Sequence, residues 1–347
     1  MLSPVRFGII GCGDVAADTC LSISHCADAS VAMLMDHQPS ALRDLADMYD
    51  VPTTTNLDDV LRNPELNAVY VATPHDLHRS IGVQAAQAGK HVLMEKPIAT
   101  TLEDADALIA ACRESNVRLG VAFYAQTDTS LAYARDIVRA GLVGDIISVR
   151  LAALAQKPAS YWTSGYSQRV TTDWRTVKAR SGGGVTIMNI IHDINTLLWV
   201  TGLVPARVYA EMDTLSTSVE VEDTVGAVIR FTNGAIGTAH GGSALPGGAH
   251  KDARGPRVFG TKGQLILGPK VYAYLGQALE GGQSDTWQEL RVADPQGGRD
   301  AMVDGFVQAV LSDAEPPVTG EAARKALELV LAIYQSAEHG APVTLPL

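Results

Sequence analysis

Residues 5–16, VRFGIIGCGDVA, decide the fold of this chain. The apolar run Val5–Ile10 predicts a buried strand, and Gly11, Gly13 and Ala16 form the GxGxxA pattern of a strand-to-helix turn. Gly11 permits a tight turn, and Gly13 lets the backbone approach a pyrophosphate at the N–H groups of the helix start. The stretch therefore predicts a dinucleotide site contacted by Gly11, Cys12, Gly13, Asp14 and Val15.

The acid at the end of the next predicted strand supports this interpretation. Asp36 follows the run Ser30–Met35 at the distance expected of a carboxylate that binds the adenosine ribose. Such a carboxylate accepts hydrogen bonds from the ribose hydroxyls and repels a 2′-phosphate. His37 and Gln38 follow it, without an adjacent arginine. NAD is therefore favoured over NADP, although Arg43, one helical step further on, leaves NADP open.

The first third of the chain alternates short apolar runs with amphipathic segments. Further strands are predicted at Ala68–Ala72, His91–Met94 and Val117–Phe123, and helices at Pro39–Tyr49, Leu77–Ala88 and Leu102–Ser115. This βαβ alternation is typical of a doubly wound parallel sheet. We assign residues 1–123 to an N-terminal Rossmann domain of the α/β class.

The pattern changes after this domain, so residues 124–347 are assigned to a second, α+β domain. Asn233–Gly234 joins two alternating runs and is a strong signal for a β-hairpin. Strands are predicted at 146–154, 223–231, 235–242, 264–267, 271–275 and 290–292, and helical stretches at 130–140, 184–200, 301–312 and 320–339. A mainly antiparallel sheet is expected.

Composition excludes several classes of function. The 347 residues carry a formal net charge of −11, and no basic run offers a surface for nucleic acid. The longest apolar runs are too short to span a bilayer, and the first residues do not resemble a signal peptide. The 4 cysteines follow neither a disulfide pattern nor the spacing of a metal site. We expect a cytoplasmic protein without a metal.

Two further loops carry polar side chains where predicted parallel strands end. In VYVATPHDLHRS the residues Thr73, Pro74, His75 and His78 follow one strand, and in HVLMEKPIAT the pair Glu95 and Lys96 follows its neighbour. Each feature alone has a plain alternative, namely a polar helix start or a solvated ion pair. Because ligands of such sheets bind at the carboxyl ends of the strands, the group as a whole favours a cofactor crevice.

These motifs occur in an order that resembles one known family. GIIGCGDVA, VATPHDLH and HVLMEKPIA are followed by WRTVKARSGGGVTIMNIIHDINTLLWVTG, GTKGQLIL and LELVLAIYQSAEHGAPVTL. The set is similar to the glucose–fructose oxidoreductase, inositol dehydrogenase and rhizopine catabolism (Gfo/Idh/MocA) family over nearly the whole chain. The resemblance implies a second domain with an open, mostly antiparallel sheet. It also implies NAD(P)-dependent oxidation or reduction of a sugar, cyclitol or related polyol.

The resemblance also assigns catalytic roles. It implies that Lys96 lies beside the nicotinamide and the reacting oxygen, that Glu95 orients it, and that Pro97 stiffens the turn, often through a cis peptide. Desolvation and the positive nicotinamide would disfavour the ammonium form of Lys96, which can then accept the alcohol proton. His192 is the implied second acid/base. Many relatives carry Asp where this chain has Met188, so Asn189 is expected to orient the substrate.

Substrate and partner contacts complete the expectations. Lys96, Tyr124, Trp174, Arg175, Asn189 and His192 are expected to bind the substrate, with Gln126, Tyr161, Trp162, Asp173 and Lys178 as further candidates at the rim. For Tyr161 and Trp162 a position in a surface loop or at an interface is the alternative. Because the sheet of the second domain should leave one face uncovered, we expect a homodimer or homotetramer that buries it. Two other functions stay open: an NAD-dependent glycosidase that oxidises C3 of a sugar transiently, and a nicotinamide-binding sensor without turnover.

Overall fold

The computed structural model describes residues 4–248, 255–268, 270–279 and 281–347, and these divide into two compact units. Unit 1 consists of Met1–Tyr124, Pro158–Gly182 and Gly297–Arg324. Unit 2 consists of Ala125–Lys157, Gly183–Gln296 and Lys325–Leu347. Each unit is therefore built from pieces that are far apart in sequence.

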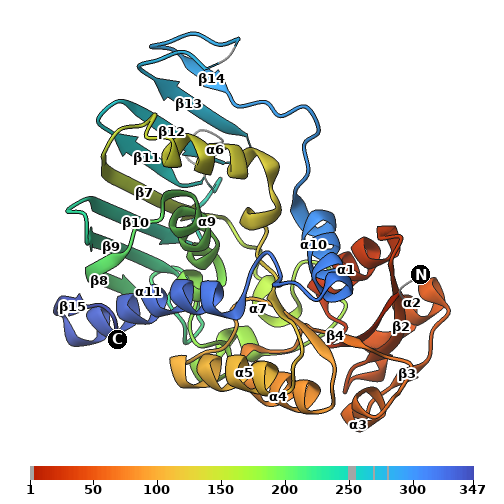
Figure 1. Ribbon diagram of the computed structural model, residues 1–347. Helices are drawn as coiled ribbons and strands as arrows, with labels where there is room; N and C mark the ends of the chain where they lie inside the picture. The colour runs from red at the N-terminus through yellow and green to blue at the C-terminus, as the bar shows by residue number, and fades with distance from the viewer. Residues whose placement is uncertain (1–3, 249–254, 269, 280) are drawn as a thin grey trace. The chain divides into compact units, whose positions relative to one another are not determined.

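Unit 1 contains a parallel sheet with the strand order β3-β2-β1-β4-β5-β6 (Figure 1). Its strands are β1 (Val5–Ile10), β2 (Ala29–Met35), β3 (Thr53–Thr54), β4 (Ala68–Val71), β5 (His91–Met94) and β6 (Leu119–Val121). Its helices are α1 (Asp14–His25), α2 (Pro39–Tyr49), α3 (Leu57–Leu61), η1 (His75–Leu77), α4 (His78–Gln87), α5 (Leu102–Glu114), α7 (Tyr161–Ser164), η3 (Trp174–Thr176), α8 (Lys178–Ser181) and α10 (Gly298–Ser312). The predicted doubly wound sheet is confirmed.

Several predicted boundaries in unit 1 were wrong, since β4 ends at Val71 rather than Ala72, β6 ends at Val121 rather than Phe123, and α10 begins at Gly298 rather than residue 301. Strand β6 begins at Leu119 rather than Val117, because the Val117 N–H donates to the Cys112 carbonyl at 3.0 Å and still closes the end of α5. The helix expected from Leu77 begins instead as the short turn η1, and α4 follows from His78.

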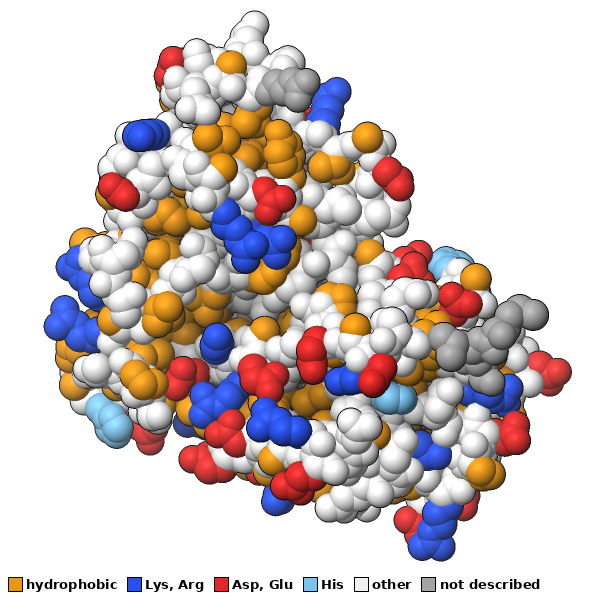
Figure 2. Space-filling model, in the orientation of Figure 1, with side chains coloured by type: hydrophobic (Ala, Val, Ile, Leu, Met, Phe, Trp, Pro, Cys, Tyr) orange, Lys and Arg blue, Asp and Glu red, His pale blue; other side chains and the backbone are white. Residues whose placement is uncertain are grey.

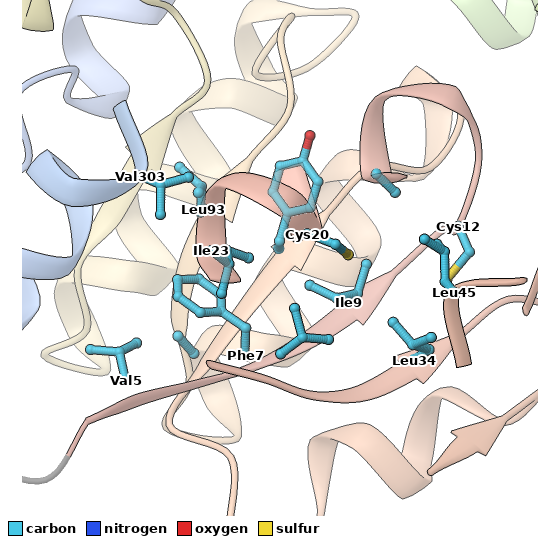
Figure 3. Close-up of a cluster of buried hydrophobic side chains, with 14 of the residues drawn as sticks. Val5, Phe7, Ile9, Cys12, Cys20, Ile23, Leu34, Leu45, Leu93 and Val303 are labelled. Atoms are coloured by element: carbon cyan, nitrogen blue, oxygen red, sulfur yellow. The ribbon is translucent and has the colours of Figure 1, made fainter. Parts of the chain in front are cut away.

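The core of unit 1 joins the first strand to a late helix. Phe7 of β1 and Ile23 of α1 are fully buried together with Val303 and Phe306 of α10. The rings of Phe7 and Phe306 lie 6.0 Å apart. Figure 3 shows Phe7, Ile23 and Val303 pointing toward the same apolar volume. Burial of such side chains stabilises the fold by about 1.5–3 kcal/mol each, so α10 is an integral part of this unit.

Unit 2 contains a mixed sheet with the order β14-β13-β12-β11-β7-β10-β9-β8-β15. Only β7 and β10 pair in parallel among its described strands. The strands are β7 (Ile146–Leu154), β8 (Pro205–Asp213), β9 (Thr224–Phe231), β10 (Ile236–Gly242), β11 (Arg257–Gly260), β12 (Gly263–Leu267), β13 (Val271–Leu275), β14 (Trp287–Glu289) and β15 (Val343–Thr344). The mostly antiparallel sheet is confirmed, and so is the hairpin at Asn233–Gly234.

Helices of unit 2 include η2 (Ala125–Thr127), α6 (Thr129–Arg139), the π-helix η4 (Thr186–Ile190), α9 (Ile191–Thr201) and most of α11 (Gly320–His339). Figure 1 shows α6 and α9 over one face of the sheet. Arg135 of α6 lies 4.5 Å from the centre of the Trp199 ring of α9, which ties the two helices together.

One predicted strand of unit 2 was wrong, and four strands of this unit were not predicted, namely β8, β11, β14 and β15. Residues 290–292 are not a strand, because the ladder ends at β14 and the Leu290 N–H makes a last bond of 2.8 Å to Val271. The stretch predicted as one helix from 184 to 200 begins as the π-helix η4, whose wider turn changes the phase of the side chains.

Across the described ranges, every helix is too short or too polar to cross a bilayer. The same residues contain no cluster of His, Cys, Asp and Glu that could bind a metal ion. Figure 2 shows basic and acidic side chains interspersed over the face in view.

Candidate functional site

The glycine turn after β1 has the geometry of an anion cradle. Gly11 has a φ of +89°, and a Cβ there would lie 2.6 Å from the Ala72 carbonyl oxygen. A Cβ on Gly13 would meet nothing within 4 Å. Gly13 is also the N-cap of α1, and it has no side chain that could cap the N–H groups of the first turn. A pyrophosphate fits this cradle.

Asp36 is positioned to receive the adenosine ribose. Its carboxylate is buried, and Oδ2 accepts the Cys12 N–H at 2.8 Å while Oδ1 accepts the Gln38 N–H at 2.8 Å. The exposed His37 ring lies 3.3 Å from Oδ1. A carboxylate has about four acceptor positions, so two remain for ribose hydroxyls. Arg43 is exposed on α2.

The loop after β4 contains a threonine and two histidines that face different surroundings. Thr73 Oγ1 is buried and has no hydrogen-bond partner among the described residues, as expected of a group that binds a ligand. His78 is fully buried, with Nδ1 2.8 Å from the Pro97 carbonyl and Nε2 3.1 Å from the Thr73 carbonyl. Burial lowers the pKa of His78, and its neutral ring donates to one of these oxygens at a time. His78 thus joins the two loops.

His75 lies beside the predicted catalytic lysine. Its Nδ1 donates to the Ser181 carbonyl at 2.7 Å, and its ring is 4.5 Å from the Trp174 ring in an edge-on arrangement. Burial lowers the pKa of His75 well below its usual range, and the charge of Lys96 acts in the same direction. His75 is therefore neutral at physiological pH.

The EKP turn after β5 is held by its glutamate. Glu95 is buried, and Oε1 accepts the Tyr70 hydroxyl at 2.6 Å while Oε2 accepts the Lys96 N–H at 3.0 Å. The peptide between Lys96 and Pro97 is cis. The Lys96 side chain is partly exposed. The carboxyl ends of β1, β4 and β5 meet at one edge of the sheet, which brings the three predicted cofactor loops together in unit 1.

The aromatic segment 158–182 packs within unit 1. The Arg175 guanidinium lies 4.7 Å from the centre of the Trp174 ring and 5.1 Å from that of Tyr161. Tyr161 and Trp162 are buried, so the surface-loop alternative for them was wrong. Lys178 begins α8, and the exposed Asp173 carboxylate pairs with Arg180 at 2.6 Å.

The same segment contacts the predicted cofactor loops, which the sequence did not indicate. The Tyr166 N–H donates to Asp14 Oδ2 at 2.7 Å, and the Ser167 N–H donates to Asp14 Oδ1 at 3.3 Å. Gln38 Nε2 donates to the Thr171 carbonyl at 3.3 Å. The contacts of Asp14 and of Gln38 join residues more than a hundred positions apart, so no local sequence motif predicts them.

The second group of predicted site residues lies in unit 2, on η4 and α9. Met188 is buried, and Asn189 and His192 are partly exposed. The start of η4 is held by Glu222, whose Oε2 accepts the Gly184 N–H at 2.6 Å and whose Oε1 accepts the Thr186 N–H at 2.9 Å. The Tyr334 hydroxyl donates to Oε1 at 2.8 Å. Neither Glu222 nor Tyr334 was predicted as a site residue.

Several buried acceptors of unit 2 have no partner in the described part of the chain, among them Asn189 Oδ1 and Asp193 Oδ2 in the segment that carries His192 and Gln126 Oε1 on η2. Burial raises the pKa of Asp193 to about 7, and the Ala152 N–H only partly opposes this shift. Unsatisfied acceptors of this kind are typical of a site whose hydrogen bonds are completed by a ligand.

The glycine cradle and the ribose carboxylate define unit 1 as a dinucleotide-binding Rossmann unit. Comparison with known families gives the class its name. Residues 5–123 match the model of an oxidoreductase family with an NAD-binding Rossmann fold, and residues 131–266 match the C-terminal domain model of the same Gfo/Idh/MocA family. The chain belongs to this family of NAD(P)-dependent sugar oxidoreductases.

Individual relatives extend over the whole chain. A 1,5-anhydro-D-fructose reductase from Ensifer adhaerens is 28% identical over 338 residues, which is 96% of this chain and 97% of that protein. The WlbA dehydrogenase from Bordetella pertussis, solved with NADH and UDP-GlcNAcA, is 28% identical with a TM-score of 0.82, covering 99% of each chain. An aldose-aldose oxidoreductase from Caulobacter crescentus, solved with glycerol, is 26% identical with a TM-score of 0.83 over 99% of this chain and 100% of its own.

Proposed function

We propose that this protein transfers a hydride between a nicotinamide cofactor and a secondary alcohol or ketone of a sugar, cyclitol or related polyol. The observation that carries the proposal is the convergence of the open Gly13 cradle, the buried Asp36 and Lys96 at one edge of the parallel sheet. The names of the relatives, which act on sugars or were solved with sugar nucleotides, support the substrate class.

In the proposed reaction the cofactor, when bound, accepts or returns the hydride. The Gly11–Val15 turn would bind its pyrophosphate, Asp36 its ribose, and Thr73, Pro74 and His75 its nicotinamide half. We propose NAD as the preferred cofactor, because the Asp36 carboxylate is buried and would repel a 2′-phosphate. The exposed Arg43 is the residue that would favour NADP.

Lys96 would move the proton of the reacting hydroxyl. As the carbinol C–H bond breaks, the O–H proton passes to a neutral Lys96 amine, and in the reverse direction the Lys96 ammonium returns it. The neutral His75 adds no positive charge beside the proton acceptor. We propose His192 as the second acid/base and Asn189 as a group that orients the substrate. Trp174, Arg175 and Tyr124 would contact the sugar.

The test is a screen of inositols, aldoses, glycosides and anhydrosugars with NAD or NADP, followed through the absorbance of NADH. A dehydrogenase accumulates reduced cofactor with at least one polyol. Conversion of a glycoside without net reduction would instead identify the glycosidase alternative. Cofactor binding without conversion of any substrate class would identify a sensor.

We also propose a cytoplasmic homodimer or homotetramer in which a second copy covers the outer face of the unit 2 sheet. Tyr209 and Val228 are direct neighbours on β8 and β9, and both are exposed on that face. Trp287 at the β14 edge is 45% exposed and lies 5.9 Å from the Tyr274 ring. Exposed apolar groups on a sheet face are typical of subunit interfaces. A monomer in light scattering at micromolar concentration would contradict this.

A further inference from the structure

Arg299 of α10 connects segments of unit 1 that the proposed reaction uses. Its guanidinium Nη1 donates to Thr19 Oγ1 at 2.8 Å and lies 3.6 Å from Glu95 Oε1. Its Nη2 lies 3.8 Å from Asp18. The guanidinium also lies 5.5 Å from the centre of the Tyr124 ring. One side chain thus contacts α1, the EKP turn and a predicted substrate contact.

Glu95, which pairs with Arg299, also binds the backbone of Lys96. Glu95 is 5% exposed, and its two carboxylate oxygens have different partners. Oε1 accepts the hydrogen bond of the Tyr70 hydroxyl and pairs with the Arg299 guanidinium, while Oε2 accepts the Lys96 N–H at 3.0 Å. A buried carboxylate is stable only when charges and donors surround it. Removal of Arg299 or of the Tyr70 hydroxyl therefore acts on the Lys96 backbone through Glu95.

The electrostatics agree with this connection. Burial acts to lower the pKa of Arg299, but Tyr124, Tyr70, Glu95 and Asp18 outweigh it and raise that pKa. Burial and the Glu95 charge raise the pKa of Tyr70 well above its usual range, so its hydroxyl keeps the proton that it donates. The raised pKa values therefore keep the Arg299 guanidinium charged and the Tyr70 hydroxyl protonated at physiological pH.

We propose that Arg299 and Tyr70 are positioning residues that hold Lys96 in its reactive orientation through Glu95. The inference rests on the proposed role of Lys96 in proton transfer. A reacting group must be held to within about 0.5 Å of its productive position by its supporting contacts. Loss of the Arg299 or the Tyr70 contact with Glu95 would leave the amine of Lys96 in place as a chemical group but would let its position vary.

The kinetic test uses Tyr70→Phe, which removes one hydroxyl from a buried ring, together with Arg299→Met and Arg299→Lys. We expect kcat to fall about 10–100-fold in Tyr70→Phe and Arg299→Met, with the sugar KM within about twofold. Arg299→Lys should restore part of the loss. Arg118→Met is the matched control, because Arg118 and Arg299 have equal side-chain exposure of 19% and Arg118 pairs with Asp313 and Glu315. It should leave kcat unchanged.

A double-mutant cycle separates positioning from general damage. If Tyr70 acts through Lys96, then Tyr70→Phe should cost nothing further in a Lys96→Met background. Multiplicative losses in the double variant would overturn the inference. Near-normal turnover of Lys96→Met itself would instead contradict the proposed function, so the two failures are distinguishable.

Hydrogen exchange gives a readout without cofactor or substrate. The Lys96 amide, bonded to Glu95, should exchange about tenfold faster or more in Tyr70→Phe and Arg299→Met than in the parent or in Arg118→Met. Unchanged protection of this amide in both variants would overturn the inference whatever the kinetics show. Equal loss of protection in Arg118→Met would do the same, because it would mean that unit 1 is loosened as a whole.

Discussion

Two buried glutamates, one in each unit, hold a predicted catalytic segment by different means. Glu95 accepts the Tyr70 hydroxyl and one backbone N–H, and Arg299 stands 3.6 Å away as a counterion. Glu222 accepts the Tyr334 hydroxyl and two backbone N–H groups at the start of η4, and among described residues no cation pairs with it. The comparison teaches that a buried carboxylate can be stabilised by a counterion or by the dipoles of a helix start.

The largest expected effect is the loss of turnover when Lys96, the residue next to Glu95, is replaced. Lys96→Met keeps the apolar stem but deletes the group that changes protonation state, so turnover should fall about 10²–10⁴-fold with little change in NAD affinity. His192→Ala should also reduce turnover. The measurement is kcat beside a cofactor titration, with Arg118→Met as control. If Lys96→Met kept near-normal turnover, the Glu95 network would hold only a solvated charge.

Asp193 is a buried carboxylate with weaker support, because the Ala152 N–H only partly opposes the effect of its burial. Its pKa rises from 3.8 to about 7, so between these pH values the folded protein keeps a proton that the unfolded chain has released. Folding stability must therefore fall as pH rises through this range and stay level above it. Asp193→Asn should remove that slope and stabilise the protein at pH 8 by on the order of 2–4 kcal/mol.

Urea unfolding of the protein without ligands, measured from pH 5 to pH 8, checks this prediction. Asp173→Asn is the control, because Asp173 is exposed and paired with Arg180. If the unfolding free energy of Asp193→Asn depended on pH as that of the parent does, the pKa of Asp193 would not be raised in the folded protein, and the prediction would be wrong.

A direct comparison of the two glutamates is expected to give a smaller effect. Among the described residues, Glu95→Gln leaves Arg299 with Asp18 as its one carboxylate neighbour, at 3.8 Å, whereas Glu222→Gln leaves no such cation without a partner. We expect Glu95→Gln to cost about 2 kcal/mol of unfolding free energy more than Glu222→Gln. Urea titrations of both variants beside Tyr70→Phe and Tyr334→Phe measure the difference. Equal costs would show that the counterion adds nothing to the hydrogen bonds.

Asp36 is a third buried carboxylate, and we propose that it binds the ribose of the cofactor. Like Glu222 it accepts two backbone N–H groups, here from Cys12 and Gln38. Asp36→Ala should weaken NADH binding about tenfold, or ~1.4 kcal/mol, and NADPH binding less, because the repulsion of a 2′-phosphate is also lost. Fluorescence titrations with both nucleotides check this, with Asp44→Ala on the exposed side of α2 as control. Unchanged NADH affinity would remove Asp36 from the site.

Sequence predicted the features that depend on neighbouring residues. The turn from Gly11 to Gly13 and the strand before Glu95 follow from local patterns, and the structure places them as expected. The contact of Arg299 with Glu95 joins residues that no periodicity relates. Glu222 lies in a stretch that reads as a polar loop, and its role appears only when Tyr334 and Gly184 meet it. The π-helix η4 has no residue signature, because it is defined by its hydrogen bonds.

Helix α10 has a consequence for how this protein is made. Val303 and Phe306 complete the core around Phe7 and Ile23, yet they leave the ribosome after nearly nine-tenths of the chain. At about 5–20 residues per second, the first strand waits roughly 15–60 s for this partner. During synthesis its apolar face is exposed to solvent, which makes the unfinished chain a candidate client for chaperones. Yield should therefore depend on the speed of translation more than the stability of the finished molecule suggests.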